Sequence, residues 1–537
     1  MNLKTKVMKK LFLLLSVMAS FQLFSQDLTL DDITTTELKN SIRLNHIFIN
    51  QPDITYCYNR PECTSTYTLK PKAGILGLNY NIPLNDWLYT GAGFHAASIG
   101  DQGGLFTLGV NLGVNLPIYK KLFFDANIHF GGGGGFRSLV NGGAIVYANA
   151  GLQYKLENIS FGLQYGYLDF VTGIQGGDNV SFFLEIPTTL RVGSYKDSQK
   201  EFTVNNNYKD DFWEKPAVKS VQQVKFDFFF PMGRTRTDGQ GNFNNAQPIT
   251  QTLYIIGFEY QRYINTNTFL YAHLDTMYSG LRAGFMDMFF GVGKNFIETE
   301  YVNFFAKFGL GAAGGRIFPE NGLTMYPSAG FDVRFTENFG LSFHGGYHRS
   351  LGATFEALTS GISLKYYGLS GGSKNPINNT KGKYIKTQGI QIGVQNQTYF
   401  DVAILDRPDN DLQQIALKLN YDITNRIYVS GEASFAYEGG AGGYAHGIFG
   451  LGLKSNKFLN DKISLFAEAA AGVAGGGGVD SGEGVLVRPS VGINYHLNDD
   501  FNLNLSAGQM WSPFGNVNST NINVGFTYSL SILNLKK

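Results

Sequence analysis

The sequence predicts an all-β protein made of transmembrane antiparallel β-barrels, and three observations favour this fold class. Charged residues make up only 16% of the 537 residues, against about 25% in ordinary soluble domains. Glycine and aromatic residues are abundant, with 67 Gly and 14% aromatics. Beyond the N-terminal segment no run of about 18 apolar residues occurs, so helical membrane spans are excluded and strands remain as the crossing elements.

The first 25 residues carry the features of a secretory signal peptide. Four lysines within the first ten residues precede an apolar stretch from Leu11 to Met18, and the small Ser25 offers a cleavage point. The net charge of +1 leaves no electrostatic footprint for nucleic acid, so that class of partner is not expected.

Alternation at a period of two marks the strands. The clearest case is the 11-residue segment from Phe106 to Leu116, in which six apolar side chains alternate with five small or polar ones. A tilted strand needs about 9–11 residues to cross a bilayer, whereas a helix would scatter these apolar residues around its axis. The same alternation marks Leu76–Ile82, Val146–Leu156 and Ile159–Tyr167. The last two of these are joined by a two-residue turn, which is typical of the periplasmic side of a barrel.

A repeat divides the mature chain into three similar parts. Glycine-rich runs at 131–135, 311–315 and 475–478 are each followed by an alternating segment whose Gly lies 16, 15 and 14 residues after the run. We interpret the runs as bends between strands and loops, because they lack the Lys-Ser/Thr and the helix of a phosphate site. The predicted domains are a signal peptide (1–25), repeat 1 (27–193), a linker (194–217), repeat 2 (218–368), a linker (369–387) and repeat 3 (388–537).

Each repeat contains about eight alternating segments, so two architectures are possible. The chain could form three tandem eight-stranded barrels or one wide 24-stranded barrel. Long polar linkers at the repeat boundaries favour three small barrels, because turns on the periplasmic side of a single barrel are short. Inward positions rich in Gly, Asn, Ser and Gln also suit a narrow interior that side chains fill.

On these features each repeat resembles the small outer-membrane barrels of the OmpX/OmpW and porin-like group of Gram-negative bacteria. The leader ending Phe-Ser-Gln and the Asn- and Lys-rich turns are similar to those of Bacteroidota proteins. The resemblance covers nearly all of the mature chain and implies an outer-membrane location and fold rather than an activity. The chain departs from the group at its end, where the last strand holds Phe526 and Tyr528 but continues to Lys537.

Candidate chemistry is sparse. His348 and Ser350 would share one face of a strand, with Glu356 downstream, and small barrels with lipid A deacylase activity resemble this His-x-Ser arrangement. A polar interior position explains the same residues without any catalysis. The six-residue spacing of Cys57 and Cys63 favours a disulfide loop in an oxidising compartment.

Charged residues on the inward faces of the strands form a second group. In a narrow barrel, charges of mixed sign would pair, because lone buried charges are costly; in a wide barrel they would line water. The expected interior polar residues are Asp125, Lys155 and Glu185 in repeat 1, Glu259, Asp332 and Arg334 in repeat 2, and Glu432 in repeat 3.

No metal site or cofactor is expected. The acidic loop with Asp406, Asp409 and Asp411 lacks the glycine and terminal Glu of a calcium-binding loop, so we interpret it as solvated. Trp87 and Tyr89 follow a turn and suit an interfacial aromatic belt.

Three functions remain open from the sequence. The first is a structural or interaction role, as a scaffold or anchor in the cell envelope. The second is a porin-like channel formed by one wide barrel, and the third is a lipid-acting hydrolase. The expected partners are outer-membrane lipid and lipopolysaccharide, with other outer-membrane or periplasmic proteins.

Overall fold

The computed structural model describes residues 28–29, 35–51, 53, 55–57, 66–135, 141–203, 218–239, 245–317, 321–336, 338–370 and 384–536. Apart from one short 3-10 helix, the described chain is built from strands, turns and loops. Within these ranges, no helix is both long and apolar enough to cross a membrane. The signal peptide predicted at residues 1–25 lies outside the described residues.

The first barrel is closed by eight antiparallel strands. Its last strand pairs with its first from Asp178 opposite Asn50 to Gly193 opposite Thr35. The strands are β2(Thr35–Asn50), β5(Lys72–Pro83), β6(Leu88–Ile99), β7(Phe106–Tyr119), β8(Leu122–Gly134), β9(Ala144–Lys155), β10(Ser160–Phe170) and β11(Gly176–Gly193).

Barrel 2 closes in the same way, with the last strand paired to the first from Val218 opposite Ser370 to Pro231 opposite Ala357. Its strands are β13(Val218–Pro231), β14(Leu253–Tyr263), β15(Thr268–Ser279), β16(Met286–Glu298), β17(Val302–Gly314), β18(Leu323–Arg334), β19(Phe339–Ser350) and β20(Glu356–Ser370).

Barrel 3 closes through a long pairing between its first and last strands, from Tyr384 opposite Lys536 to Tyr399 opposite Asn521. Its strands are β21(Tyr384–Val402), β22(Asn410–Asp422), β23(Ile427–Glu438), β24(Ala445–Lys454), β25(Ile463–Gly475), β26(Val485–His496), β27(Phe501–Trp511) and β28(Asn518–Lys536).

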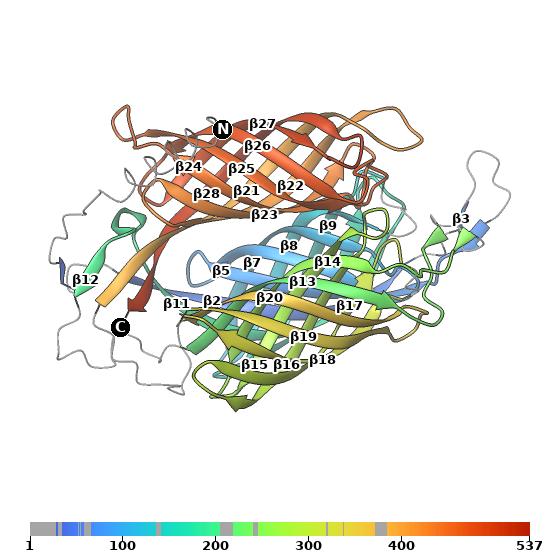
Figure 1. The fold of residues 1–537 in the computed structure, drawn as a ribbon, viewed down its shortest axis with the longest axis horizontal. Helices are drawn as coiled ribbons and strands as arrows, with labels where there is room; N and C mark the ends of the chain where they lie inside the picture. The colour runs from blue at the N-terminus through green and yellow to red at the C-terminus, as the bar shows by residue number, and fades with distance from the viewer. Residues whose placement is uncertain are drawn as a thin grey trace, which may run out of the picture.

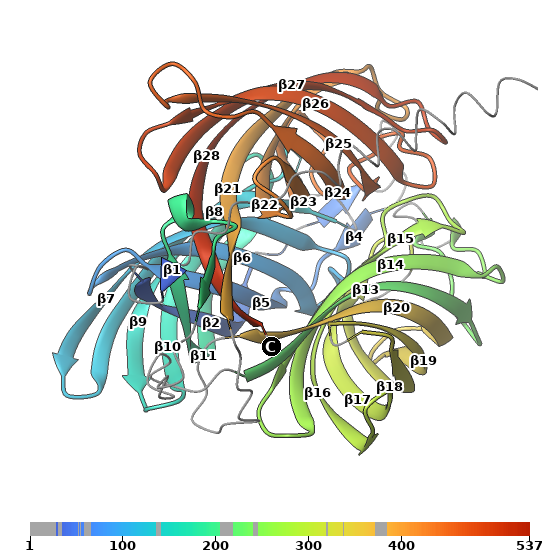
Figure 2. The same ribbon diagram turned by 60° about the vertical axis from the view of Figure 1, so that its left-hand side comes forward.

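The prediction of three tandem eight-stranded barrels is therefore confirmed, and the chain does not form one 24-stranded barrel. Figure 1 shows barrel 1 in blue between barrel 3 in red and barrel 2 in green and yellow. Seen from the side in Figure 2, the three barrels surround a common centre. Barrels 1 and 3 also share a two-residue pairing of β11 with β28, at Val192 opposite Ile532.

The segment predicted as the first linker contains structure. A 3-10 helix, η2(Tyr195–Asp197), and a short strand, β12(Glu201–Thr203), follow barrel 1. The β12 strand pairs with the start of β21 and with β1(Leu28–Thr29). The Tyr195 hydroxyl donates to Asp422 at 2.7 Å, and burial together with that carboxylate raises the pKa of Tyr195 well above its ordinary value. The segment therefore fastens barrel 1 to barrel 3. The polar, non-periodic sequence of this segment does not indicate the role, because the segment contacts strands of another barrel that are distant in the sequence.

The outward faces of all three barrels are apolar, as the alternation predicts. In β7, Leu112 and Leu116 are exposed, whereas Asn111 is buried inside the barrel. Large exposed apolar side chains cover the outside of each barrel, among them Ile128, Leu152, Leu163, Phe226, Leu270, Val292, Phe308, Val394, Leu451, Val491 and Val524. On a water-exposed surface this coverage would be unfavourable, since soluble proteins rarely expose apolar patches larger than a few hundred Å². Barrels of this kind place such faces in hydrocarbon.

Candidate functional site

The interior of barrel 3 is held by hydrogen-bonded ion pairs, of which Arg488 and Glu432 are the most buried. Arg488 donates to the two oxygens of Glu432 at 2.7 and 2.8 Å, and both side chains are almost fully buried. Tyr399 accepts from Arg488 at 2.9 Å, and Gln397 donates to Glu432 at 2.8 Å. Because both charges are paired and hydrogen-bonded, the network satisfies the condition under which buried charges are tolerated.

The interior of barrel 1 is also held by a buried arginine that pairs with carboxylates. Arg43 donates to both oxygens of Asp125 at 2.9 Å and to Glu185 at 2.6 Å. Gln164 and Asn115 also donate to Asp125, at 2.7 and 2.9 Å.

In barrel 2 the cations are lysines. Lys225 lies 2.5 Å from Asp275 and 3.1 Å from Asp227, Lys307 lies 2.5 Å from Glu259, and Lys365 lies 2.8 Å from Asp332. All of these side chains are buried.

The predicted interior residues therefore fall into two groups. Asp125, Glu259, Asp332 and Glu432 are buried inside their barrels. Three others lie nearer the ends: Glu185 is paired with Arg43, Lys155 lies over the Phe123 ring, and Arg334 pairs with Glu298.

These side chains leave little space within the barrels. The cavity among Arg43, Asn79 and His129 in barrel 1 measures about 10 Å³, and the cavity beside Lys418 in barrel 3 about 20 Å³. One water molecule needs about 10–15 Å³. Neither cavity is therefore a path for solutes through its barrel.

The three glycine-rich runs lie where the barrels touch. They end β8, β17 and β25, the fifth strand of each barrel, and each faces a glycine in a loop of the next barrel. Gly104 of barrel 1 meets Gly315 of barrel 2, Gly284 of barrel 2 meets Gly475 of barrel 3, and Gly443 of barrel 3 meets Gly135 of barrel 1. A Cβ atom at Gly104, Gly475 or Gly443 would lie 2.5, 2.5 or 2.8 Å from the facing backbone nitrogen.

The three loop glycines also share an unusual backbone conformation. Gly104, Gly284 and Gly443 have φ of +91°, +133° and +86°, which other residues adopt only with strain. The Gly443 amide donates to Gly133 across the barrel boundary at 2.9 Å, and Ala283 donates to Gly482 at 3.0 Å. The sequence analysis assigned the runs to bends within one sheet, whereas these glycines also let neighbouring barrels approach.

Below these glycine junctions, apolar side chains from all three barrels form one buried cluster. It contains Ala96, Phe106 and Leu108 of barrel 1, Met288 and Ala312 of barrel 2, and Phe435 and Ala445 of barrel 3. Phe106 and Leu108 thus belong to the same alternating face as exposed Leu112, but they lie where that face meets a neighbouring barrel.

A cavity of about 1390 Å³ lies between the barrels. We call it the central cleft. Its walls are mostly outward-facing apolar side chains from every barrel, including Phe94, Leu108, Phe258, Leu274, Leu417 and Phe449, and it also reaches the polar Lys418, Glu432 and His446 of barrel 3.

Charged side chains from the glycine-end loops surround the mouth of the central cleft. Among the described residues they are Arg282, Arg316, Arg407, Asp238 and Asp406, of which Arg316 and Asp238 lie 4.0 Å apart, and one positive charge is in excess. Arg316 is held by a bond from its Nε to the Ala283 carbonyl at 3.0 Å. The Nη2 atom of Arg282 is buried and has no hydrogen-bond partner among the described residues. The mouth therefore offers donors to an anion.

The predicted catalytic residues do not assemble into a hydrolytic site among the described residues. His348 and Ser350 both point into barrel 2 and are buried, but their side-chain nitrogens and oxygen lack hydrogen-bond partners in the described chain. Glu356 instead accepts from the Tyr347 hydroxyl at 2.9 Å. A base must contact its nucleophile for this chemistry.

The remaining expectations have mixed outcomes. Cys63 lies outside the described residues, so the Cys57–Cys63 disulfide stays a prediction. Trp87 is exposed and its place in an aromatic belt stays a prediction, whereas the prediction is wrong for Tyr89, which is 8% exposed. Its hydroxyl lies 3.3 Å from Asp125 inside barrel 1, because two residues beyond the turn the strand already faces inward.

The sequence analysis missed the side chains that hold the interiors together. Arg43 and Arg488 are the central cations of their barrels, and His273, Asp275 and Asp287 form a buried cluster in barrel 2. Alternation was the available signal, since Arg43 shares a face with Ser41 and Asn45. The pairing across strands was not visible without the register.

Comparisons with known proteins leave the function open. No protein-family model matches the chain, and no curated protein matches it. Among solved structures, a designed transmembrane β-barrel is 15% identical, covers 28% of this chain and 97% of its own, and has a TM-score of 0.19.

Two further structures cover more of the chain at similarly low likeness. A mutant of the ferric enterobactin receptor PfeA of Pseudomonas aeruginosa is 9% identical over 91% of this chain and 81% of its own, with a TM-score of 0.27. OccK10 (OpdN) of the same organism is 9% identical over 92% of this chain and 99% of its own, with a TM-score of 0.21. At these values the function has to be inferred from the geometry of the chain itself.

Proposed function

We propose that this chain is an integral outer-membrane protein with a scaffold role, in which three filled barrels surround and hold an anionic lipid. The location follows from the exposed apolar faces, the short turns at one end of every barrel and the longer loops at the other. The single observation that carries the proposal is the central cleft, whose walls come from all three barrels and whose mouth carries three arginines.

The walls indicate the chemistry of the ligand. They continue the outer faces of the barrels, so the cleft lies at the depth of the hydrocarbon layer. Water is disfavoured against such walls, and acyl chains are the apolar molecules available at that depth. The volume of about 1390 Å³ exceeds the ~300–1,000 Å³ of pockets that take drug-sized ligands, which suits a molecule with long chains.

The charged side chains at the mouth of the central cleft indicate the chemistry of the lipid headgroup. Arg282, Arg316 and Arg407 outnumber Asp238 and Asp406 there. Arginine binds phosphate and carboxylate groups through paired donors. The Nη2 atom of Arg282 is buried and has no hydrogen-bond partner among the described residues. A phosphate-bearing lipid satisfies both ends of the cleft.

Lipid retention tests this proposal. The protein is extracted from outer membranes in a mild detergent, and bound lipid is counted by native mass spectrometry. We expect the wild type to retain anionic lipid after washing that strips annular lipid. The Arg282→Gln/Arg316→Gln variant should retain less of it, whereas Arg426→Gln at an exposed turn should behave as wild type.

A second variant tests the walls of the cleft. Gly447 lines the cleft, and a Cβ there would meet no atom within 4 Å, so Gly447→Phe fills the space without a clash at its base. It should expel lipid. The matched control is Gly345→Phe, on β19 away from the cleft. Equal lipid retention by the wild type and all four variants would contradict the proposal.

A further inference from the structure

Barrel 2 carries buried negative charge that its own cations do not balance. Its fully buried charged side chains are five carboxylates and three lysines: Asp227, Glu259, Asp275, Asp287, Asp332, Lys225, Lys307 and Lys365. Two negative charges are therefore left over when the histidines are neutral. The part-exposed group of Lys219, Arg334 and Glu298 lies at the turn end, where two cations share one carboxylate and one positive charge is left over.

On the same count of fully buried side chains, the described parts of the other two barrels carry at most one excess negative charge each. In barrel 1, Arg43 and Lys155 face Asp125 and Glu185. In barrel 3, Lys418 and Lys454 pair with Glu468 and Asp422, and Arg488 pairs with Glu432. Barrel 2 has no buried arginine among its described residues. Since unpaired buried charges are costly, the excess requires a bound cation or added protons.

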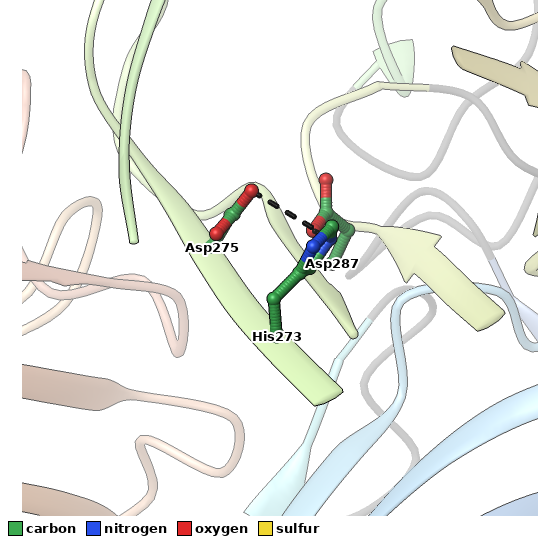
Figure 3. Close-up of side chains that lie close together, drawn as sticks. All are labelled: His273, Asp275 and Asp287. Carbon is green, nitrogen blue, oxygen red and sulfur yellow. Dashed lines mark ion pairs between the residues drawn. The ribbon is translucent and has the colours of Figure 1, made fainter. Parts of the chain in front are cut away.

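The excess is concentrated at one point of barrel 2. Asp275 on β15 lies directly opposite Asp287 on β16 in the strand register, and like charges at opposite positions destabilise a sheet. His273 stands between them, with its Nε2 3.7 Å from Asp275 Oδ2 and 3.5 Å from Asp287 Oδ1. Asp275 Oδ2 also accepts from Lys225 at 2.5 Å, which leaves Asp275 Oδ1 as the oxygen open to a further ligand. Figure 3 shows the three side chains converging from the two strands.

A fourth side chain reaches the cluster from β19. His348 is fully buried, and its Nε2 lies 3.5 Å from Asp287 Oδ2. Both of its ring nitrogens lack a hydrogen-bond partner among the described residues, as do both oxygens of Asp287, Nε2 of His273 and Oδ1 of Asp275. So many unsatisfied polar atoms in one buried place are unusual, because native interiors leave few of them.

The second nitrogen of His273 is already oriented. Its Nδ1 lies 3.3 Å from Glu259 Oε2, and Lys307 holds that carboxylate at 2.5 Å. When Nδ1 donates its proton to Glu259, Nε2 presents a lone pair toward Asp275 and Asp287. A carboxylate behind a ligating histidine is the usual second contact of a zinc ligand.

We propose that barrel 2 binds one divalent transition-metal ion, zinc foremost, through His273 Nε2, His348 Nε2 and the carboxylates of Asp287 and Asp275. Tetrahedral zinc at bond lengths of about 2.0–2.2 Å places neighbouring ligand atoms roughly 3.4 Å apart. The ligand atoms of His273, Asp275 and Asp287 lie within 4.8 Å of one another, His273 Nε2 is 3.5–3.7 Å from the two carboxylates, and His348 joins the set through its 3.5 Å approach to Asp287. One divalent ion also supplies the two missing positive charges.

The apolar residues around the cluster indicate a structural metal site rather than a catalytic one. The His348 ring is packed against Phe229, Phe285, Phe289 and Phe355, and three of these belong to the apolar cluster that fills the loop end of barrel 2. A metal bound below this cluster has no route for rapid exchange. We expect it to be captured as the barrel closes, because its ligands come from β15, β16 and β19.

Metal content tests the proposal directly. The full chain is purified from outer membranes without a histidine tag or added metal and analysed by inductively coupled plasma mass spectrometry. We expect about one equivalent of zinc per chain that survives dialysis against a chelator, as a sealed site requires. The chain is then refolded with a chelator, with Zn²⁺ or with Co²⁺ alone. Refolding with Zn²⁺ should raise the thermal midpoint of barrel unfolding, and Co²⁺ should give the visible absorption of tetrahedral cobalt.

Variants separate metal from protons. Asp287→Asn and His348→Gln should each lose the metal and the cobalt spectrum, whereas His446→Gln, a buried histidine of barrel 3, should keep both. If instead the native protein carries no metal, and refolding with Zn²⁺ or Co²⁺ changes neither midpoint nor spectrum, the excess charge is neutralised by protonated histidines and the proposal fails. Because the wild type alone gives this result, a variant that does not fold leaves the test intact.

Discussion

One added methyl group can break the contact between barrels 1 and 2. Gly104 has a φ of +91°, and a Cβ placed there would lie 2.5 Å from the backbone nitrogen of Gly315 in barrel 2. Gly104→Ala therefore combines two costs. The left-handed backbone costs an alanine about 1–2 kcal/mol, and forcing an atom against a neighbouring backbone costs about 1–3 kcal/mol.

These costs act on the junction rather than on either barrel. The strand pairings that close barrels 1 and 2 do not involve Gly104, so both barrels should still form. A penalty of about 2–5 kcal/mol weakens docking of barrel 1 on barrel 2 by roughly 30- to 4,000-fold. We expect the two barrels to separate at their glycine ends in a measurable fraction of molecules.

Pulsed electron paramagnetic resonance measures this separation. Spin labels are placed at exposed loop residues Val171 of barrel 1 and Leu351 of barrel 2, in a chain with Cys57→Ser and Cys63→Ser. The wild type should give one narrow distance distribution, and Gly104→Ala a broader and longer one.

The matched control is Gly447→Ala, which lies on the wall of the same cleft with open space around its Cβ position. It should reproduce the wild-type distribution. If Gly104→Ala gives that distribution as well, the glycine contacts do not hold the barrels together and the reasoning is refuted.

Two further predictions concern the barrels themselves. Arg488→Gln should destabilise barrel 3 by about 3–5 kcal/mol because it leaves Glu432 buried and unpaired, and the added Glu432→Gln should restore much of that loss. Urea unfolding followed by the fluorescence of Trp511 measures the stability of both variants. Equal stability of the single and double variants would contradict the pairing. Leu112→Lys puts a charge on the outer face at mid-strand and should lower the free energy of unfolding in lipid vesicles by about 2–4 kcal/mol, whereas Leu84→Lys at a turn should lower it by about 0–1 kcal/mol. Equal folding yields of the two variants would mean that the outer face of β7 does not contact hydrocarbon.

Local pattern was enough to predict the strands and to favour three small barrels over one wide barrel. The alternation from Phe106 to Leu116 lies within β7, and an even number of strands in each repeat returned the chain to the same side. A narrow interior followed from the small and polar inward residues. These properties depend on neighbours in sequence or on the next strand, which is why composition and periodicity contain them.

The features that depend on distant strands were not predictable in the same way. A glycine run suits a bend in one sheet and a contact between two barrels equally well, and only the assembled chain shows that Gly315 faces Gly104. His273, Asp287 and His348 lie on three different strands, so their convergence depends on register and barrel curvature. Phe106 and Leu108 share an alternating face with Leu112, yet contact with another barrel buries them.

The conductance of single molecules in a planar bilayer tests the central claim most directly. The mature chain is refolded into vesicles, its insertion is verified by protease protection, and the vesicles are fused with the bilayer. Barrels filled by networks such as Arg488–Glu432 and Arg43–Asp125, around a cleft occupied by lipid, should carry no steady current. Large and steady openings from inserted protein would mean that a continuous water path crosses the molecule, which would contradict the filled barrels and the lipid-holding cleft together.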